Sequence, residues 1–279
     1  MQSFSLRVAR FGLPVMMGLL MATASGAADF QAARPAVRID YWQQRQADIS
    51  AELASRKDLS KVRLVFLGDS ITDFWHLEED PWMKGRRFGR SIWDAAFGGA
   101  NPENFAINLG ISGDRTEHIL NRVRPMAQGG LGHLDAPDLN PEFIVLMAGI
   151  NNSWTPEEPV ADSVFEGVRA VVLAAHERKP KARIILQSLL PTNDVARNRD
   201  VVAPVNRRLA ALASDPAYSG YLLWLNLHPA FLDADGKQIS EDFVDGLHPD
   251  IKGYMVWRDR LVAFLSEVRG KGRTASASH

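Results

Sequence analysis

The chain contains no cysteine among its 279 residues. Disulfide bonds, thiolate nucleophiles, cysteine-ligated metals and a lipid-modified amino-terminal cysteine are therefore excluded. Long basic runs are also missing, and the formal net charge is -1 at pH 7, so nothing indicates a nucleic-acid partner. The sequence has no His-x-x-x-His or zincin spacing, no calcium-loop pattern and no glycine-rich phosphate loop with a lysine. We therefore expect neither a metal nor a cofactor.

Residues 1–27 have the pattern of an export signal. Arg7 and Arg10 precede an apolar stretch over 11–21, and the small residues that follow suit cleavage after Ala27. The apolar stretch is shorter than the ~20 residues that a membrane span needs, so we favour cleavage over an anchor. Cleavage lowers the basic residues from 32 to 30 against 33 acidic ones. We predict a periplasmic or secreted protein without stable membrane insertion.

Composition and patterning predict one domain. Hydrophobic residues make up 46% of the sequence and charged residues 23%, which is typical of a soluble protein with a large core. No repeat or Pro/Gly/Ser-rich linker divides the chain, so we predict a domain over 28–269, with an N-terminal helix over 36–57. The polar stretch 270–279 is predicted to be a disordered tail.

Five apolar runs predict β-strands, with helical patterns between them. Alternation of strand and helix favours a parallel sheet covered on both faces. We therefore predict a three-layer α/β/α sandwich with a parallel sheet of about five strands. The predicted strands are 62–67, 104–108, 143–147, 182–187 and 221–225, and the main predicted helices are 115–123, 160–175, 198–214 and 251–268.

The chain turns at Gly68-Asp69-Ser70, directly after the first predicted strand. Ligands of open α/β sheets bind at the carboxyl ends of strands, so Ser70 is placed for chemistry. Taken alone, such a turn is more often plain punctuation between elements. Three further segments favour a catalytic interpretation.

Two of these segments supply candidate oxyanion donors. Gly113 lies in the turn after the second strand, where a loop-to-helix junction presents backbone N–H groups, and Asp114 with Glu117 resembles a capping box. Asn151 follows the third strand, and its side-chain amide can donate to an oxyanion. Each also has a plainer interpretation, as an ordinary βα turn or as an asparagine that satisfies its own turn.

Asp245 and His248 lie three residues apart before the last predicted helix. A serine hydroxyl is a poor nucleophile until a base takes its proton. Histidine suits that task near neutral pH, and a carboxylate orients the imidazole and stabilises the imidazolium. A single Asp-x-x-His is weak evidence, because most such pairs lie in surface turns. Its place in order with the other segments favours the catalytic interpretation.

Together these segments resemble the four blocks of the GDSL/SGNH hydrolase family, from about residue 62 to 265. The resemblance implies Ser70 as nucleophile, His248 as general base and acid, and Asp245 as the orienting carboxylate. It also implies an oxyanion hole made of the Ser70 and Gly113 backbone N–H groups and the Asn151 side chain. The blocks are Gly68-Asp69-Ser70, Gly110-x-x-Gly113, Gly149-x-Asn151 and Asp245-x-x-His248.

Residues 108–118 and 189–191 look similar to the platelet-activating-factor acetylhydrolase-like branch of this family. That similarity implies an acetyl or other short acyl ester and leaves the alcohol open. The export signal departs from the intracellular animal members and argues against a lipid mediator. We predict an exported serine esterase acting on short acyl esters of small molecules or carbohydrates.

Other residues compete for some of these roles. Ser112 adjoins the glycine that should donate its N–H, and His228 lacks an acid at loop spacing, so both are weaker candidates than Ser70 and His248. Trp154 is a candidate to line the acyl or leaving-group pocket, and Asp69 is a second substrate-binding candidate.

Three alternative functions stay open on the sequence. One is a lysophospholipase or thioesterase of broad specificity, and another is a polysaccharide O-acetyltransferase that uses the same acyl-enzyme. The third is a carbohydrate-binding protein on an inactive hydrolase scaffold. The oligomeric state is not indicated.

Overall fold

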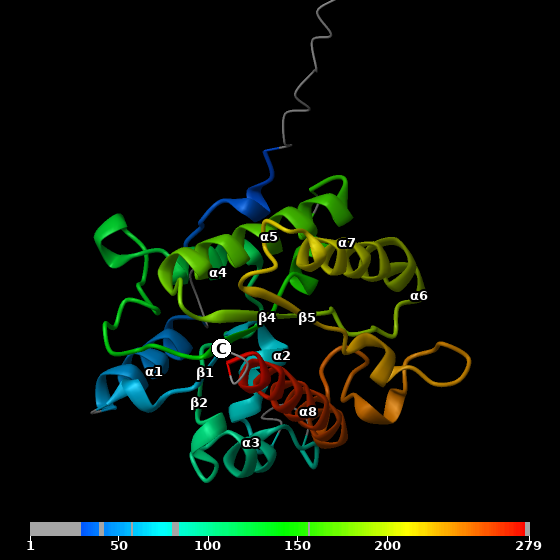
Figure 1. The fold of residues 1–279 in the computed structure, drawn as a ribbon. Coiled ribbons are helices and arrows are strands. Elements are labelled where there is room, and N and C mark those ends of the chain that lie inside the picture. The colour runs from blue at the N-terminus through cyan, green and yellow to red at the C-terminus, as the bar shows by residue number, and fades with distance from the viewer. Residues whose placement is uncertain (1–28, 39–41, 57, 80–83, 156, 277–279) are drawn as a thin grey trace, which may run out of the picture.

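The computed structural model describes residues 29–38, 42–56, 58–79, 84–155 and 157–276, so the predicted export signal lies outside the described residues. Five parallel strands form one sheet in the order β2-β1-β3-β4-β5 (Figure 1). All residues of β1 and β3 are buried, as expected for apolar runs in a parallel sheet covered on both faces. The strands are β1 (Leu64–Gly68), β2 (Ala106–Asn108), β3 (Phe143–Met147), β4 (Arg183–Gln187) and β5 (Leu222–Leu225).

Helices cover both faces of the sheet, and the predicted three-layer α/β/α architecture is confirmed. In Figure 1, α4 (Thr116–Val123), α5 (Val160–Arg178) and α7 (Ala203–Ser214) lie above the sheet, whereas α3 (Arg90–Ala96) and α8 (Ile251–Ser276) lie below it. Helix α1 (Trp42–Ser55) lies beside the edge strand β2. Short helical segments complete the described chain: α2 (Ser70–Asp73), α6 (Val195–Arg197), a π segment (Asn198–Val202) and 3₁₀ turns at Gln31–Ala33, Leu59–Lys61, Phe74–His76, Pro102–Asn104, Met126–Gln128, Ile150–Trp154, His228–Phe231 and Ser240–Asp242.

The two ends of the chain differ from the prediction. Residues 36–38 are not helical, because tertiary contacts hold them, including the Ala36 N–H that donates to Glu117 O at 2.9 Å. At the other end, α8 continues to Ser276, through most of the stretch predicted to be disordered from residue 270. Once a helix exists, each further residue adds a backbone hydrogen bond, and Lys271 pairs with Glu267 one turn earlier.

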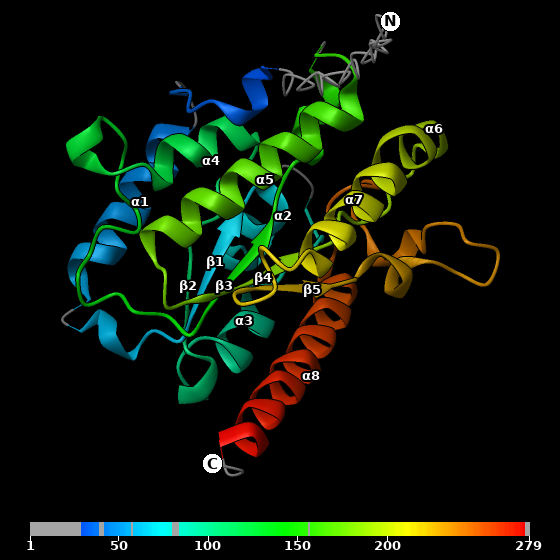
Figure 2. The same ribbon diagram turned by 45° about the horizontal axis from the view of Figure 1, so that its top comes forward.

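A cluster of aromatic rings fixes α8 against α2 and against the 3₁₀ turn that follows α2. Trp75 is fully buried, and its ring centroid lies 4.5 Å from that of Tyr254 and 5.0 Å from that of Trp257. The Tyr254 hydroxyl donates to the carbonyl oxygen of Ile71 at 2.8 Å. Figure 2 shows α8 running back from this point toward the opposite end of the sheet. The loop that precedes α8 is thereby held beside the turn that follows β1.

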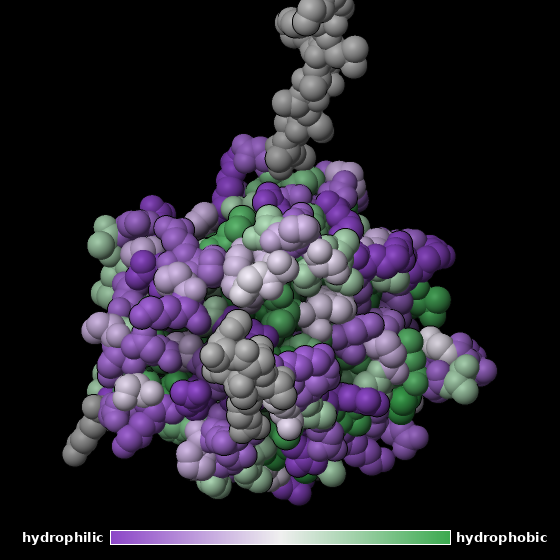
Figure 3. Space-filling view, viewed as in Figure 1, coloured by the Kyte–Doolittle hydropathy of each residue, from purple (hydrophilic) through white to green (hydrophobic). Residues whose placement is uncertain are grey.

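The surface is mainly polar on the face drawn in Figure 3, with apolar side chains scattered between polar ones. Over the described ranges, no helix combines the length and the apolar character needed to cross a bilayer.

Candidate active site

Ser70 lies where β1 ends and the chain turns into α2. Gly68 is required at the end of the strand, because a Cβ atom there would lie 2.2 Å from the Thr72 hydroxyl oxygen. Asp69 caps the helix, and its Oδ1 accepts the backbone N–H of Ile71 at 3.0 Å. The glycine and the aspartate therefore set the position of the serine.

Asp245 and His248 face Ser70 from the loop before α8. His248 Nε2 lies 2.9 Å from Ser70 Oγ, and His248 Nδ1 lies 2.7 Å from Asp245 Oδ2. The second Asp245 oxygen accepts the backbone N–H groups of Leu247 at 2.9 Å and His248 at 2.8 Å. Gly246 closes this turn with a φ of +81°, in the left-handed region that favours glycine. The three residues predicted to act together are thus in contact.

Hydrogen bonds keep the Asp245 carboxyl ionised. Partial burial raises its pKa, but the ring and the backbone N–H of His248 both donate to it, and the net effect lowers the pKa to about 2. The carboxylate is therefore charged at neutral pH. A charged carboxylate on Nδ1 holds the tautomer in which Nε2 is free to accept the Ser70 proton.

The other two predicted oxyanion donors lie on the loops after β2 and β3. Gly113 adopts a φ of +76°, and the Asn151 side chain reaches the same loop, where its Nδ2 donates to the carbonyl oxygen of Asp114 at 2.8 Å. Asn151 keeps a second amide hydrogen for a substrate oxygen. Among the described residues, no protein acceptor takes the backbone N–H of Ser70 or of Gly113. Both groups are available to donate to a substrate oxygen.

A buried ion pair supports these loops, and the sequence did not indicate it. Asp114 is fully buried, and its Oδ2 accepts the Nε–H of Arg122 at 2.8 Å. Arg122 also donates to the carbonyl oxygens of Leu109 at 2.5 Å and Gly68 at 3.1 Å, and so joins the ends of β2 and β1. Burial raises the pKa of Asp114 to about 6, against the opposing effect of Arg122 and Arg38. A cation on a helix eight residues after an aspartate is too common a pattern to predict this contact.

The predicted capping box of Asp114 and Glu117 is wrong. Because Asp114 pairs with arginine, α4 begins instead with the Arg115 N–H donating to His118 Nδ1 at 3.1 Å. Glu117 Oε2 accepts the side-chain amide of Asn152 at 2.9 Å and so connects α4 to the turn that carries Asn151.

Asp69 does not fit the predicted contact with substrate. Its side chain is fully buried, and its Oδ2 has no hydrogen-bond partner among the described residues. Burial raises the pKa of Asp69 to about 7, while the N–H of Ile71 and the nearby His248 oppose this effect. We therefore assign Asp69 a structural role as the N-cap residue of α2.

Trp154 is accessible, in agreement with a contact to substrate. Its side chain is 51% exposed, and the Arg197 guanidinium lies 4.1 Å from the centre of its ring. Arg197 is itself fixed, because it donates to the carbonyl oxygen of Ser153 at 3.0 Å. Asn151 and Trp154 share one 3₁₀ turn, in which side chains three residues apart lie on the same side.

The rival residues make other contacts. The Ser112 N–H donates to Asp73 Oδ2 at 2.8 Å, which holds the main chain of this residue to the scaffold. Among the described residues, Ser70 and not Ser112 places its hydroxyl within hydrogen-bond distance of His248 Nε2. The backbone N–H of His228 donates to Ser188 Oγ at 2.9 Å, and the residue lines a groove of about 640 Å³ with Asn193 and Gln238. Its ring Nε2 is buried and has no hydrogen-bond partner among the described residues.

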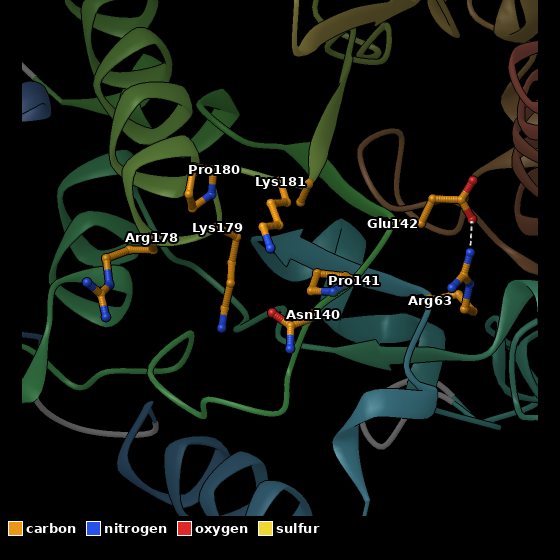
Figure 4. A pocket seen from close by; sticks show the side chains of 9 residues that line it. Arg63, Asn140, Pro141, Glu142, Arg178, Lys179, Pro180 and Lys181 are labelled. Atoms are coloured by element: carbon orange, nitrogen blue, oxygen red, sulfur yellow. Dashed lines mark hydrogen bonds and ion pairs between the residues drawn. The ribbon is translucent and has the colours of Figure 1, made fainter. Parts of the chain in front are cut away.

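A separate cavity of about 440 Å³ lies at the opposite edge of the sheet, near the amino ends of the strands (Figure 4). Arg63, Lys179 and Lys181 line it, and Arg63 pairs with Glu142 at 2.9 Å. No predicted site residue lies there, so this cavity is not part of the candidate active site. Nowhere in the described ranges do three or more His, Asp or Glu side chains gather so that they could hold a metal ion.

Known proteins resemble this chain in sequence and in fold. The chain is 30% identical to human platelet-activating factor acetylhydrolase IB subunit alpha1 over 229 residues, covering 79% of this chain and 84% of that protein. The bovine subunit is 29% identical over the same length. A GDSL-like lipase from Bacteroides thetaiotaomicron has a similar fold, with a TM-score of 0.57 at 20% identity, over 80% of this chain and 98% of that one.

A second solved structure, a member of the lipolytic G-D-S-L family from Veillonella parvula, gives a TM-score of 0.52 at 20% identity and covers 72% of this chain and 97% of that one. The GDSL-like Lipase/Acylhydrolase family matches residues 66–256, which include Ser70, Gly113, Asn151 and His248. The chain therefore belongs to the GDSL-like lipase/acylhydrolase family and is a hydrolase.

Proposed function

We propose that this chain is an exported serine esterase that removes short acyl groups, acetyl above all, through an acyl-enzyme on Ser70. The observation that carries the proposal is the continuous hydrogen-bond chain from Ser70 Oγ through His248 to Asp245, at 2.9 and 2.7 Å. Residues 1–27 would be removed on export, which leaves Ala28 as the first residue.

The reaction follows from these contacts. Ser70 Oγ attacks the ester carbonyl carbon while His248 Nε2 takes its proton, and Asp245 stabilises the imidazolium that forms. The carbonyl oxygen becomes an oxyanion that accepts hydrogen bonds from the Ser70 and Gly113 N–H groups and from Asn151. The alcohol leaves with the proton from His248. Water then attacks the acyl-serine by the same steps and releases the acid.

Two observations support an acetyl ester of a carbohydrate. The human relative is named as an acetylhydrolase, which favours an acetyl group on the acyl side. On the other side, Trp154 presents a half-exposed indole ring on the same turn as Asn151, and Arg197 covers one of its faces. The C–H face of a sugar ring packs well on such an aromatic surface. We therefore propose that Trp154 contacts the alcohol part of the substrate.

The test is hydrolysis of p-nitrophenyl esters, from acetyl to dodecanoyl, by the chain that begins at Ala28. We expect activity to fall steeply beyond butyryl and Ser70→Ala to lose about 10⁴-fold or more in kcat. Ser112→Ala is the matched control and should keep activity. Wild-type turnover by folded Ser70→Ala would contradict the proposal, and activity that rises with chain length would favour the lysophospholipase or thioesterase alternative. Acetylated sugar formed in the presence of a sugar acceptor would identify an O-acetyltransferase.

A further inference from the structure

The segment over residues 29–38 is bound to the helices that carry the oxyanion loops. Thr116 at the start of α4 donates its hydroxyl to Ala32 O at 2.8 Å, and the Ala36 N–H donates to Glu117 O at 2.9 Å. The Ala32 N–H donates to Glu157 Oε2 at 3.2 Å, just before α5. Figure 1 shows this segment lying over α4 and α5. Hydrogen bonds to α4 and to Glu157 therefore fix the position of residues 29–38.

Arg38 ends this segment at the loop that contains Gly113. Its Nη1 donates to the carbonyl oxygen of Ser112 at 2.7 Å and to Asp114 Oδ1 at 3.3 Å. Between these contacts, the guanidinium packs against Gly113, where a Cβ atom would lie only 2.8 Å from Nη2. One arginine thus touches three consecutive residues of the loop.

We propose that Arg38 is a positioning residue for the esterase reaction, holding the 112–114 turn so that both loop-borne oxyanion donors face the substrate oxygen. The inference rests on the proposed function. Fixing this turn directs the Gly113 N–H. It also fixes the carbonyl of Asp114, which accepts Asn151 Nδ2 at 2.8 Å and so orients the Asn151 amide. Donors aimed in advance stabilise the developing oxyanion without reorganisation during the reaction.

Arg38 differs from Arg122, the other arginine on Asp114, in how far the fold depends on it. Arg122 is fully buried and joins two strand ends, whereas the Arg38 side chain is 24% exposed to solvent. Replacing Arg38 should therefore loosen the loop without opening the core.

The experiment compares Arg38→Ala and Arg38→Lys with Arg34→Ala, a control in the same segment whose arginine forms an exposed ion pair with Asp29. With p-nitrophenyl acetate, we expect Arg38→Ala to lower kcat by about 10- to 100-fold and KM to stay within about threefold, because oxyanion donors act in the transition state. Arg38→Lys keeps the charge without the planar fork and should fall between Arg38→Ala and the wild type. Added guanidinium should restore part of the Arg38→Ala activity, whereas Arg34→Ala should behave as wild type.

A kcat for Arg38→Ala within twofold of wild type would overturn the inference. An equal loss of kcat in Arg34→Ala would do the same, since it would indicate general loosening of the segment. Should Arg38→Ala fail to fold, Arg38→Gln decides, because it keeps most of the side-chain volume and removes the fork. Ser70→Ala is measured in parallel: if it is active the proposed function fails, and if it is inactive while Arg38→Ala matches wild type only this inference fails.

Discussion

The molecule contains two Asp-x-x-His pairs, and they differ in what surrounds them. In the first, His248 Nδ1 lies 2.7 Å from Asp245 and its Nε2 lies 2.9 Å from Ser70 Oγ. In the second, His76 Nδ1 lies 3.0 Å from Asp73 Oδ1. Both pairs therefore share the spacing and a close approach of carboxylate to ring, but the hydrogen bond of His76 Nδ1 is to the main-chain oxygen of Asp73.

The carboxylates have different partners. Asp73 is fully buried, forms an ion pair with Arg45 at 2.7 Å and accepts the Ser112 N–H at 2.8 Å, so it holds α1 and the loop after β2 together. Among the contacts of the described residues, the Asp245 carboxylate accepts hydrogen bonds only from its own turn and from the His248 ring.

The histidines also face different groups. His76 lines a cavity of about 450 Å³ with Arg90 and Trp93, and none of the described residues that line it is a serine. The Asp73 pair lies on helical backbone, whereas Gly246 turns the Asp245 pair toward β1 with a φ of +81°. The spacing brings acid and base together, but the backbone decides whether the second ring nitrogen meets a nucleophile.

The largest difference in kcat should appear between two single variants, in which either histidine is replaced by alanine. We expect His248→Ala to lower kcat for p-nitrophenyl acetate by about 10⁴-fold or more, because Ser70 then has no base. His76→Ala should stay within about threefold of wild type, since its ring faces no serine. Steady-state kinetics on both purified variants measure the two kcat values. Similar losses of kcat in the two variants would contradict the expectation that only the Asp245–His248 pair acts in the reaction.

The aspartates should separate activity from stability. Asp245→Asn should lower kcat by about 10³- to 10⁴-fold with little change in Tm, because the amide no longer holds the required tautomer. Asp73→Asn breaks a buried ion pair and should lower the free energy of unfolding by about 3–5 kcal/mol. Urea unfolding and kinetics on the same samples test both. A stable Asp73→Asn would show that Arg45 tolerates the loss of its partner.

Chain order and residue type were enough to predict the sheet, and the resemblance to the GDSL/SGNH family implied that Ser70, His248 and Asp245 act together. Runs such as Phe143–Met147 are apolar throughout, and parallel strands bring their carboxyl ends to one edge of the sheet. The roles of these residues in catalysis stay predictions. The predicted boundaries were less accurate: β2 begins at Ala106, two residues later than expected, and α8 runs eight residues beyond 268.

The contacts of buried charges could not be predicted in this way. Asp114 has a helix-capping pattern with Glu117, but the tertiary fold brings Arg122 and Arg38 to its carboxylate, and those contacts prevail. Asp69 shares a motif with Ser70, yet its carboxyl is fully buried and accepts the backbone N–H of Ile71. Apolar runs predict burial of their own side chains, but a local pattern does not show which polar side chains the tertiary fold buries.

Asp69 is buried like Asp73, but within the described ranges no arginine or lysine forms an ion pair with its carboxyl. Burial raises its pKa to about 7, so the folded state holds a proton that the unfolded chain loses near pH 4. Stability from this group is therefore complete below pH 4 and is lost as pH rises to 7, by on the order of 3 kcal/mol. Asp69→Asn removes this dependence, so its stability relative to wild type should increase from pH 4 to pH 8 in urea unfolding. A constant difference across that range would contradict the raised pKa.

The smallest effect should come from the glycine that distinguishes the two Asp–His turns. Gly246 and Gly236 have φ values of +81° and +74°, so alanine at either should cost about 1 kcal/mol in stability. A Cβ at Gly246 would also lie 2.2 Å from the Asn193 amide nitrogen, whereas at Gly236 it meets nothing within 4 Å. Gly246→Ala must therefore displace either the Asn193 side chain or the Asp245 turn, and we expect kcat to fall by about 3- to 30-fold, since small misplacements of catalytic groups are costly. Gly236→Ala should keep full kcat at a similar loss of Tm. Equal kcat in the two variants would mean that the Asp245 turn tolerates movement, and that the difference from the Asp73 pair lies in the neighbouring groups alone.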